Sequence, residues 1–357
     1  MMPNSPHVAI TGIGSVSPYG PLAGLIPPSV IEPSTITSWT TAGARRAFLV
    51  QPFRPASVVP GLKTRRLDRL SAWALVASSL ALKDAGIDLS HVDRCRVAVV
   101  FATAFGCIDL TEAFYLSAAA NGWSGTDPST FPETLPSCPA SHVSMFHGMR
   151  GPNVTVSNKY FAGEAALIQA ASLLRHGQAD LAIVLAGDAL ARTLYSYYEV
   201  AGLLSPRCYD SDPLPEAGGF IPCEGIAALV MESSGRGKAP SRTHYARIHS
   251  GRWAAGGQPV ESVRQMLGDF VPTLTVCSGN GAPCATSPTS ALAREISGGG
   301  AILLPQAVAL GLAGTGALFH LILGLSNLPS SRPANQQALL LATAANSGFA
   351  AILMELP

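Results

Sequence analysis

Thiols are the side chains best suited to chemistry in this sequence, because a thiolate is both a nucleophile and a metal ligand. No two cysteines have the C-x-x-C spacing, so neither a zinc site nor a redox pair is indicated. An odd number of cysteines in a long, apolar chain also argues against a disulfide framework. We therefore expect reduced, buried thiols in a cytoplasmic protein, with no metal ion and no cofactor. The seven are Cys95, Cys107, Cys138, Cys208, Cys223, Cys277 and Cys284.

The histidines and serines do not indicate a site either. His142 and His147 are five residues apart, a spacing more typical of ordinary helix or loop residues than of metal ligands. His320 lies in an apolar run, where we expect a buried histidine whose hydrogen bonds are satisfied. The G-x-S-x-G pattern of a serine hydrolase is absent.

Short apolar runs indicate the strands that would position any site. Between them, Leu70–Ala85 and Ala162–His176 have apolar residues at helical spacing, and Gly86 and Gly177 follow as helix ends. Uninterrupted apolar strands that alternate with helices predict an α/β protein with a mainly parallel sheet covered on both faces. The runs are Val8–Thr11, Val97–Ala102, Val154–Val156, Leu181–Ala186 and Ile226–Met231.

An internal repeat predicts that the chain contains two related halves. Gly225–Glu232 and Gly348–Glu355 are identical at five of eight positions, and the other three are apolar exchanges. We interpret them as equivalent last strands of a duplicated α/β half. The polar run 233–243 is the expected joint, so we place the halves at 1–235 and 236–357. His244–His249 and Pro272–Cys277 are expected strands of the second half.

The composition excludes several classes of protein. Hydrophobic residues make up 48% and charged residues 13% of the chain, which indicates a large core rather than disorder. The net charge of +1, without a basic cluster, argues against nucleic-acid binding. Residues 297–330 carry no charge, but seven glycines and Pro305 interrupt them. We expect a buried strand, a glycine-rich turn and a buried helix there, and no membrane span. The N-terminus lacks the pattern of a signal peptide.

Several motifs resemble those of the β-ketoacyl synthases, in the same order along nearly the whole chain. Residues 7–20 (HVAITGIGSVSPYG) resemble the opening strand and turn of that family. Gly151–Val156 resembles the strand that leads into the family's nucleophile, and residues 207–210 with 219–225 resemble its arginine–aspartate and GEG segments. The resemblance implies a thiolase-like fold, in which two duplicated α/β halves form a layered α-β-α-β-α architecture.

The resemblance also implies that the family's chemistry is lost. Ketosynthases use a cysteine at a strand-to-helix elbow and two histidines that stabilise developing charge. Counting back from Gly163 puts Tyr160 at the cysteine's position, and a phenol is a poor acyl carrier at neutral pH. Ser278 and Leu310 take the positions of the two histidines, and Pro305 takes that of a lysine. We expect the Tyr160 ring to plug the base of the former active site.

A retained scaffold without its chemistry favours a chain-length-factor-like subunit. Such a subunit forms a heterodimer with an active β-ketoacyl synthase and shapes its acyl tunnel in polyketide, aryl-polyene or fatty-acid-type chain elongation. The growing chain stays on the acyl carrier protein or on the partner's cysteine. By the same resemblance Ile108, Thr111 and Tyr115, which share one helical face, are expected to border the partner's acyl pocket.

Two alternatives remain open. A malonyl-ACP decarboxylase would need the two histidines that Ser278 and Leu310 replace, which argues against it. A standalone acyl-binding or scaffold protein is compatible with the sequence. The chain is also shorter than typical ketosynthases between Glu232 and Cys277, so we do not expect an inherited carrier-protein docking surface on that side.

Overall fold

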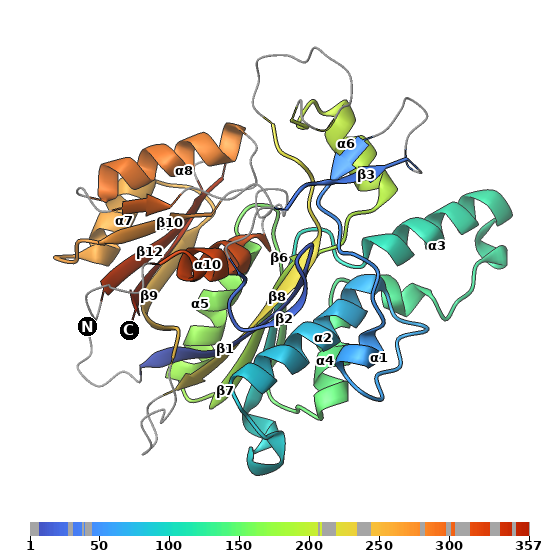
Figure 1. Ribbon diagram of the computed structural model, residues 1–357, viewed down its shortest axis with the longest axis horizontal. Coiled ribbons are helices and arrows are strands. Elements are labelled where there is room, and N and C mark those ends of the chain that lie inside the picture. Colours follow the sequence, from blue (N-terminus) through green and yellow to red (C-terminus); the bar gives the residue numbers. More distant parts are fainter. Residues whose placement is uncertain are drawn as a thin grey trace.

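One eleven-stranded sheet runs through the described part of the chain, and helices lie on both of its faces (Figure 1). The computed structural model describes residues 7–27, 31–37, 39, 45–205, 208, 219–233, 244–278, 283–297, 301–303, 315–328, 336–344 and 348–356. A separate pair of short strands, β3 (Ser34–Ile36) and β4 (Arg45–Ala47), lies outside the large sheet.

The elements of the first half precede residue 234. Its strands in the large sheet are β1 (Val8–Ser17), β2 (Gly20–Ala23), β5 (Val97–Thr103), β6 (Asn153–Ser157), β7 (Leu181–Asp188) and β8 (Gly225–Ser233). Its helices are α1 (Pro55–Val58), α2 (Arg69–Asp84), α3 (Ile108–Asn121), α4 (Cys138–His147), α5 (Ala162–Arg175) and α6 (Arg192–Val200). Short 3₁₀ turns are η1 (Leu89–His91), η2 (Arg94–Arg96), η3 (Trp123–Gly125) and η4 (Phe131–Thr134).

The elements of the second half follow residue 243. Its strands are β9 (Ala246–Ala254), β10 (Leu274–Cys277), β11 (Ala301–Leu303), β12 (Gln336–Thr343) and β13 (Phe349–Leu356). Its helices are α7 (Pro259–Leu267), α8 (Pro283–Ile296) and α10 (Ala317–Ser326).

The strand order confirms the duplication. The five main strands of the first half run β6-β5-β7-β8-β1, and those of the second run β11-β10-β12-β13-β9. Numbered along the chain within each half, both orders are 3-2-4-5-1. The repeated sequence segments fall on β8 and β13, which occupy the same place in the two halves. Residues 234–243, where we placed the boundary, lie outside the described residues, so the limits of 1–235 and 236–357 stay a prediction.

Three hydrophobic clusters lie between the layers of helices and strands. α2 and α4 cover one face of the first half's strands, and α7 and α8 cover one face of the second half's strands. α5 and α10 lie between the halves and contact strands of both (Figure 1). The layers are therefore α-β-α-β-α, as the resemblance implied. The two sets of strands meet where Val8–Ile10 of β1 pairs with Ala246–Ile248 of β9.

The predicted strands of the first half are confirmed, with longer bounds. The prediction of a mainly parallel sheet is wrong, because β8 pairs antiparallel with β1 and β7, and β13 pairs antiparallel with β9 and β12. β1 reaches Ser17 because Gly14 allows a close approach of α2: a Cβ at Gly14 would lie 2.2 Å from the carbonyl oxygen of Ala77. The uncharged stretch contains β11 and the buried helix α10, as expected. No helix in the described ranges is both long and apolar enough to cross a membrane. β12, which we did not predict, pairs with β10 and β13.

Candidate functional site

The chain turns sharply between β6 and α5, and this elbow contains Tyr160. The side-chain oxygen Oδ1 of Asn158 accepts hydrogen bonds from the backbone N–H groups of Tyr160 (2.8 Å) and Phe161 (3.3 Å). α5 begins directly afterwards, and a Cβ at Gly163 would lie 2.8 Å from the Cβ of Ala317 in α10. Gly163 therefore allows the first turn of α5 to pack tightly against α10, which fixes the position of the elbow between the two halves.

Phe161, rather than Tyr160, occupies the interior beside the elbow. The Tyr160 side chain is 40% exposed, whereas Phe161 is 2% exposed. The Phe161 ring lies 5.9 Å from that of Trp253 and packs against alanines of the second half. The small side chains there leave room for a phenyl ring. Tyr160 is thus half-exposed in the isolated chain, and its role as a plug of the former active site stays a prediction. The alanines are Ala342, Ala344 and Ala350.

Among the predicted site residues that the structure describes, Ser278 is the most deeply buried. It follows β10, and its backbone N–H donates to the carbonyl oxygen of Leu341 (2.7 Å). Glu164 from α5 and His320 from α10 converge on it from two other elements. The three are 5%, 0% and 3% exposed respectively, and Nδ1 of His320 lies 3.2 Å from Oγ of Ser278. Leu310 and Pro305 lie outside the described residues.

Burial sets the charge of this polar cluster. It raises the pKa of Glu164 to about 7, and the neighbouring Ser278 hydroxyl opposes that rise only in part. It lowers the pKa of His320 to about 3, so the imidazole is neutral at neutral pH. Within the described residues, both carboxyl oxygens of Glu164 and Nε2 of His320 have no hydrogen-bond partner. The predicted burial of His320 is confirmed. The expectation that its hydrogen bonds are satisfied is wrong for Nε2, which has no partner among the described residues.

The order of the groups does not suit nucleophilic catalysis. A serine nucleophile needs the imidazole between the hydroxyl and the carboxylate, whereas here the Ser278 hydroxyl lies between Glu164 and His320. All three side chains are also closed to solvent, so a thioester substrate has no access to them. The sequence did not reveal the cluster, because Ser278 and His320 are 42 positions apart and Glu164 lies more than a hundred positions before both. A glutamate in the first turn of an apolar helix was the only signal.

Asp188 is a second buried acid that sequence reasoning missed. Its carboxylate accepts hydrogen bonds from Oγ1 of Thr103 (2.6 Å), the N–H of Phe105 (2.9 Å) and Oγ1 of Thr315 (2.9 Å). Burial raises its pKa to about 6 despite these donors. Asp188, at the end of β7, thus connects the end of β5 to Thr315, which precedes α10. These hydrogen bonds hold the strand ends near the elbow together.

The described thiols do not replace the missing nucleophile. Cys277 is buried beside Ser278, and burial raises the pKa of its thiol to about 11. Burial also raises the pKa of the Cys107, Cys138 and Cys223 thiols. A thiol with a raised pKa is protonated at neutral pH and is a weak nucleophile. The expected burial holds for four of the described cysteines, whereas Cys138 is half-buried and Cys95 is exposed.

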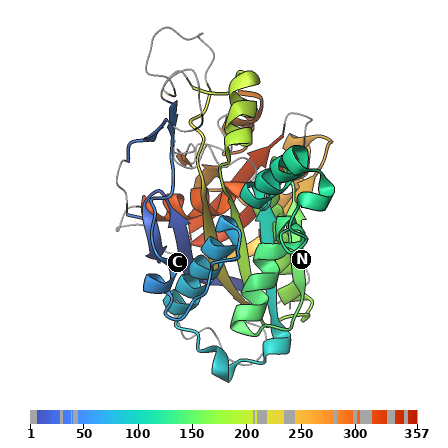
Figure 2. The same cartoon turned by 90° about the vertical axis from the view of Figure 1, so that its right-hand side faces the viewer.

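The predicted tunnel residues lie on α3, at the edge of the molecule (Figures 1 and 2). Ile108 is half-buried against the cluster beneath α2, and the Thr111 hydroxyl donates to the carbonyl oxygen of Cys107 (2.8 Å). Tyr115 is 55% exposed, and its ring lies 6.2 Å from that of Trp123. The face that these residues share thus changes from buried to exposed along the helix. Nothing in the isolated chain tests their role in an acyl tunnel.

His142 and His147 both lie on α4 and have different partners. Nε2 of His147 is 3.0 Å from Oγ of Ser78, and burial lowers the pKa of this imidazole to about 4. Nε2 of His142 is 2.8 Å from a carboxylate oxygen of Glu133. The two histidines therefore do not act as a pair, as the sequence indicated.

Comparison with known proteins identifies the family. Residues 30–236, more than half of the chain, match the family model "Beta-ketoacyl synthase, N-terminal domain". The 3-oxoacyl-(acyl-carrier-protein) synthase 2 of Vibrio harveyi is 27% identical over 258 residues, which cover 68% of this chain and 61% of that protein. Nodulation protein E of Rhizobium leguminosarum bv. trifolii is 28% identical over 252 residues, with 68% and 62% covered. The matched region thus spans less than two thirds of these relatives.

Solved structures share the fold over nearly the whole chain. The ishigamide ketosynthase/chain length factor has a TM-score of 0.78 at 18% identity, with 99% of this chain and 100% of that chain covered. A β-ketoacyl synthase from Burkholderia phymatum STM815 has a TM-score of 0.75 at 18% identity, with the same coverage. The repeated strand order, the elbow and these matches agree, and the chain belongs to the β-ketoacyl synthase family.

Proposed function

We propose that this chain is a non-catalytic, chain-length-factor-like subunit that pairs with an active β-ketoacyl-ACP synthase and shapes its acyl tunnel. The observation that carries the proposal is the elbow, which keeps its strand, turn and helix but presents Tyr160 instead of a thiol. A phenol is a much poorer acyl carrier than a thiolate. The acyl chain would therefore be carried by the partner's cysteine or by an acyl carrier protein.

The lost histidines support the same conclusion. Ser278 has the position of one of them and is buried in contact with a neutral imidazole. This arrangement offers no cationic or exposed donor to stabilise an enolate, so we do not favour the malonyl-ACP decarboxylase. Release of carbon dioxide from malonyl-ACP by the isolated chain would contradict this part of the proposal.

The edge of the sheet supports pairing with a second subunit. β6 is the last strand of the described sheet, and it pairs with β5 on one side. An edge strand offers backbone donors and acceptors to a partner strand. In the same half, α3, η3 and η4 with the residue after it expose a set of large apolar side chains, which we call the arm surface. Its members are Tyr115, Leu116, Trp123, Phe131 and Leu135, each between 45% and 69% exposed.

An active ketosynthase is the occupant that we assign to this edge. Partners of this family's fold carry an equivalent edge strand, so the two sheets could continue into each other with related apolar surfaces on both sides. A permanent pair of this kind buries on the order of 2,000 Å² or more. The standalone scaffold remains the alternative, and it would leave the arm surface exposed to water.

Co-purification tests the pairing. We expect the tagged chain to capture an active ketosynthase encoded in the same organism, and we expect Trp123→Glu to weaken that binding by at least about tenfold, because it introduces a charge into an apolar contact. Val271→Glu is the matched control. Val271 is an apolar residue of similar exposure (60%, against 69% for Trp123), but it follows α7 in the second half and does not belong to the arm surface. A stable, monodisperse monomer that captures no ketosynthase would favour the scaffold alternative.

Product length tests the tunnel assignment. In the co-expressed pair, Ile108→Ala should lengthen the acyl products and Ile108→Phe should shorten them, because the side chain is expected to limit the depth of the pocket. Thr111→Val and Thr111→Phe extend the same test one turn further along α3. Ala113→Ser is the control on the same helix, since Ala113 is exposed, lies on the opposite face and does not belong to the arm surface. Identical product distributions in all variants would refute the assignment.

A further inference from the structure

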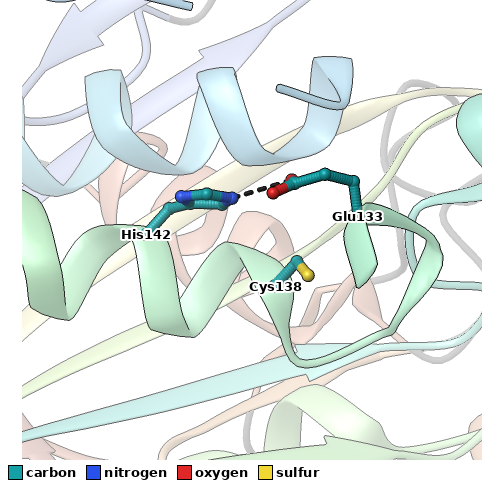
Figure 3. A group of neighbouring side chains, drawn as sticks. All are labelled: Glu133, Cys138 and His142. Atoms are coloured by element: carbon teal, nitrogen blue, oxygen red, sulfur yellow. Dashed lines mark hydrogen bonds and ion pairs between the residues drawn. The ribbon is translucent and has the colours of Figure 1, made fainter. Parts of the chain in front are cut away.

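A group of three potential metal ligands lies outside the elbow and the buried cluster. Glu133 belongs to η4, and Cys138 and His142 lie four residues apart on α4, so both face the same side of that helix (Figure 3). The three ligand atoms lie within 4.8 Å of one another. Within the part of the chain that the structure describes, this is the one such group of three or more residues.

The chemistry of this ligand set selects zinc among common divalent ions. We propose that Glu133, Cys138 and His142 bind a zinc ion, with water as the fourth ligand. A thiolate disfavours magnesium and calcium, which prefer oxygen, whereas sulfur, imidazole and carboxylate together are ordinary ligands of zinc. Sites with three protein ligands keep a position open for water, and the incomplete burial of these side chains leaves space for it.

The distances are compatible with small adjustments. Zinc bonds of about 2.0–2.3 Å at tetrahedral angles put the ligand atoms about 3.3–3.6 Å apart. Nε2 of His142 and Oε2 of Glu133 are now 2.8 Å apart in a direct hydrogen bond, so the ion would separate them by about half an ångström. The Cys138 thiol donates to the carbonyl oxygen of Pro132 (2.8 Å), and it would exchange that bond for the ion.

The backbone already holds the three side chains in place. The N–H of Cys138 donates to the carbonyl oxygen of Leu135 (3.0 Å), and that of Glu133 donates to Thr130 (3.0 Å). The Glu133 and His142 side chains are 22% and 16% exposed, so their rotamers are restricted. A site whose ligands need little ordering loses little entropy when it binds the ion.

Zinc binding should release a proton. A cysteine thiol is mostly protonated at neutral pH. Coordination requires the thiolate, and the proton therefore leaves to solvent when the zinc–sulfur bond forms. Affinity should consequently rise with pH through the neutral range.

The site would connect η4 to α4 close to α3. The carbonyl oxygen of Thr134 accepts from the Thr111 hydroxyl (3.4 Å), and that of Leu135 accepts from the Cys107 thiol (3.6 Å). A zinc ion would therefore fix the segment on which the first turn of α3 packs. This inference does not depend on the proposed function, because metal binding is measurable without a ketosynthase partner.

Metal titration of the full-length chain tests the inference. After removal of bound metal with a chelator, we expect about one zinc ion per chain in competition with a chromophoric chelator, with release of about one proton. Cobalt in the same site should give a thiolate charge-transfer band and the visible absorption of a four-coordinate ion. Zinc should also raise the melting temperature.

Three variants and two controls make the result specific. Cys138→Ser should abolish the charge-transfer band, the zinc-dependent rise in melting temperature and the stoichiometric uptake, and His142→Gln and Glu133→Gln should each weaken zinc binding. Cys95→Ser and His91→Gln change exposed residues elsewhere and should behave as the wild type. The inference is overturned if the wild type takes up no stoichiometric zinc, if cobalt shows no sulfur ligation, or if Cys138→Ser binds zinc as tightly. Glu133 and His142 would then form an ordinary polar contact.

Discussion

Replacing Glu164 with glutamine should remove a pH-dependent loss of stability. The carboxyl group is fully buried, and burial raises its pKa from the ordinary 4.5 to about 7. Below about pH 4.5 the acid is protonated in both the folded and the unfolded chain, so it costs nothing. As the pH rises towards 7, the unfolded chain ionises first, and the folded state loses stability relative to it. Above pH 7 the loss is complete.

The expected magnitude follows from the two pKa values. At about 1.4 kcal/mol per pH unit, a folded-state pKa near 7 against 4.5 corresponds to about 3 kcal/mol in total. Between pH 5 and pH 8 the wild type should therefore lose about 2.5 kcal/mol through Glu164. Glu164→Gln does not titrate. The difference in free energy of unfolding between Glu164→Gln and the wild type should therefore shift in favour of the variant by about 2.5 kcal/mol between pH 5 and pH 8.

Urea unfolding at pH 5 and pH 8, followed by tryptophan fluorescence, provides the measurement. Asp68, Asp188 and Glu224 also have raised pKa values, but they are present in both proteins and cancel in the comparison. The fixed cost of burying an amide is the same at both pH values and cancels as well. Glu261→Gln, at an exposed position of α7, is the control. If the difference between Glu164→Gln and the wild type is the same at both pH values, burial does not control this carboxyl group and the reasoning fails.

Two further pairs of substitutions test the packing around the elbow. Phe161→Ala should lower the free energy of unfolding by about 3–4 kcal/mol, because it leaves a cavity between the halves. Tyr160→Ala changes a half-exposed position and should lower it by less than about 1 kcal/mol. Equal losses in urea unfolding would contradict the assigned orientation of the two rings. Asp188→Ala should cost about 3 kcal/mol or more, because its buried donors lose their acceptor, while the exposed Asp269→Ala should have little effect. Melting temperatures of both variants provide the check, and an unaffected Asp188→Ala would show that water replaces the carboxylate.

The sequence predicted the architecture because its signals are local and repeated. Strands buried on both faces are short uninterrupted apolar runs, so β5, β7 and β8 were recognisable without any partner. The match between Gly225–Glu232 and Gly348–Glu355 predicted equivalent strands, and both lie in the same place of the 3-2-4-5-1 order. That Tyr160 takes the nucleophile's position stays a prediction from the register, counted back from Gly163.

Only the tertiary structure decided which side chains meet. Tyr160 and Phe161 are adjacent aromatic residues, and no local pattern determines which of them points into the alanine-lined space of the second half. Glu164, Ser278 and His320 come from three elements, and their contact depends on how α5 and α10 pack between the two sets of strands. Sequence thus determined the elements, because these depend on neighbours along the chain. Burial, and with it the charge of the buried acids, depends on neighbours in space.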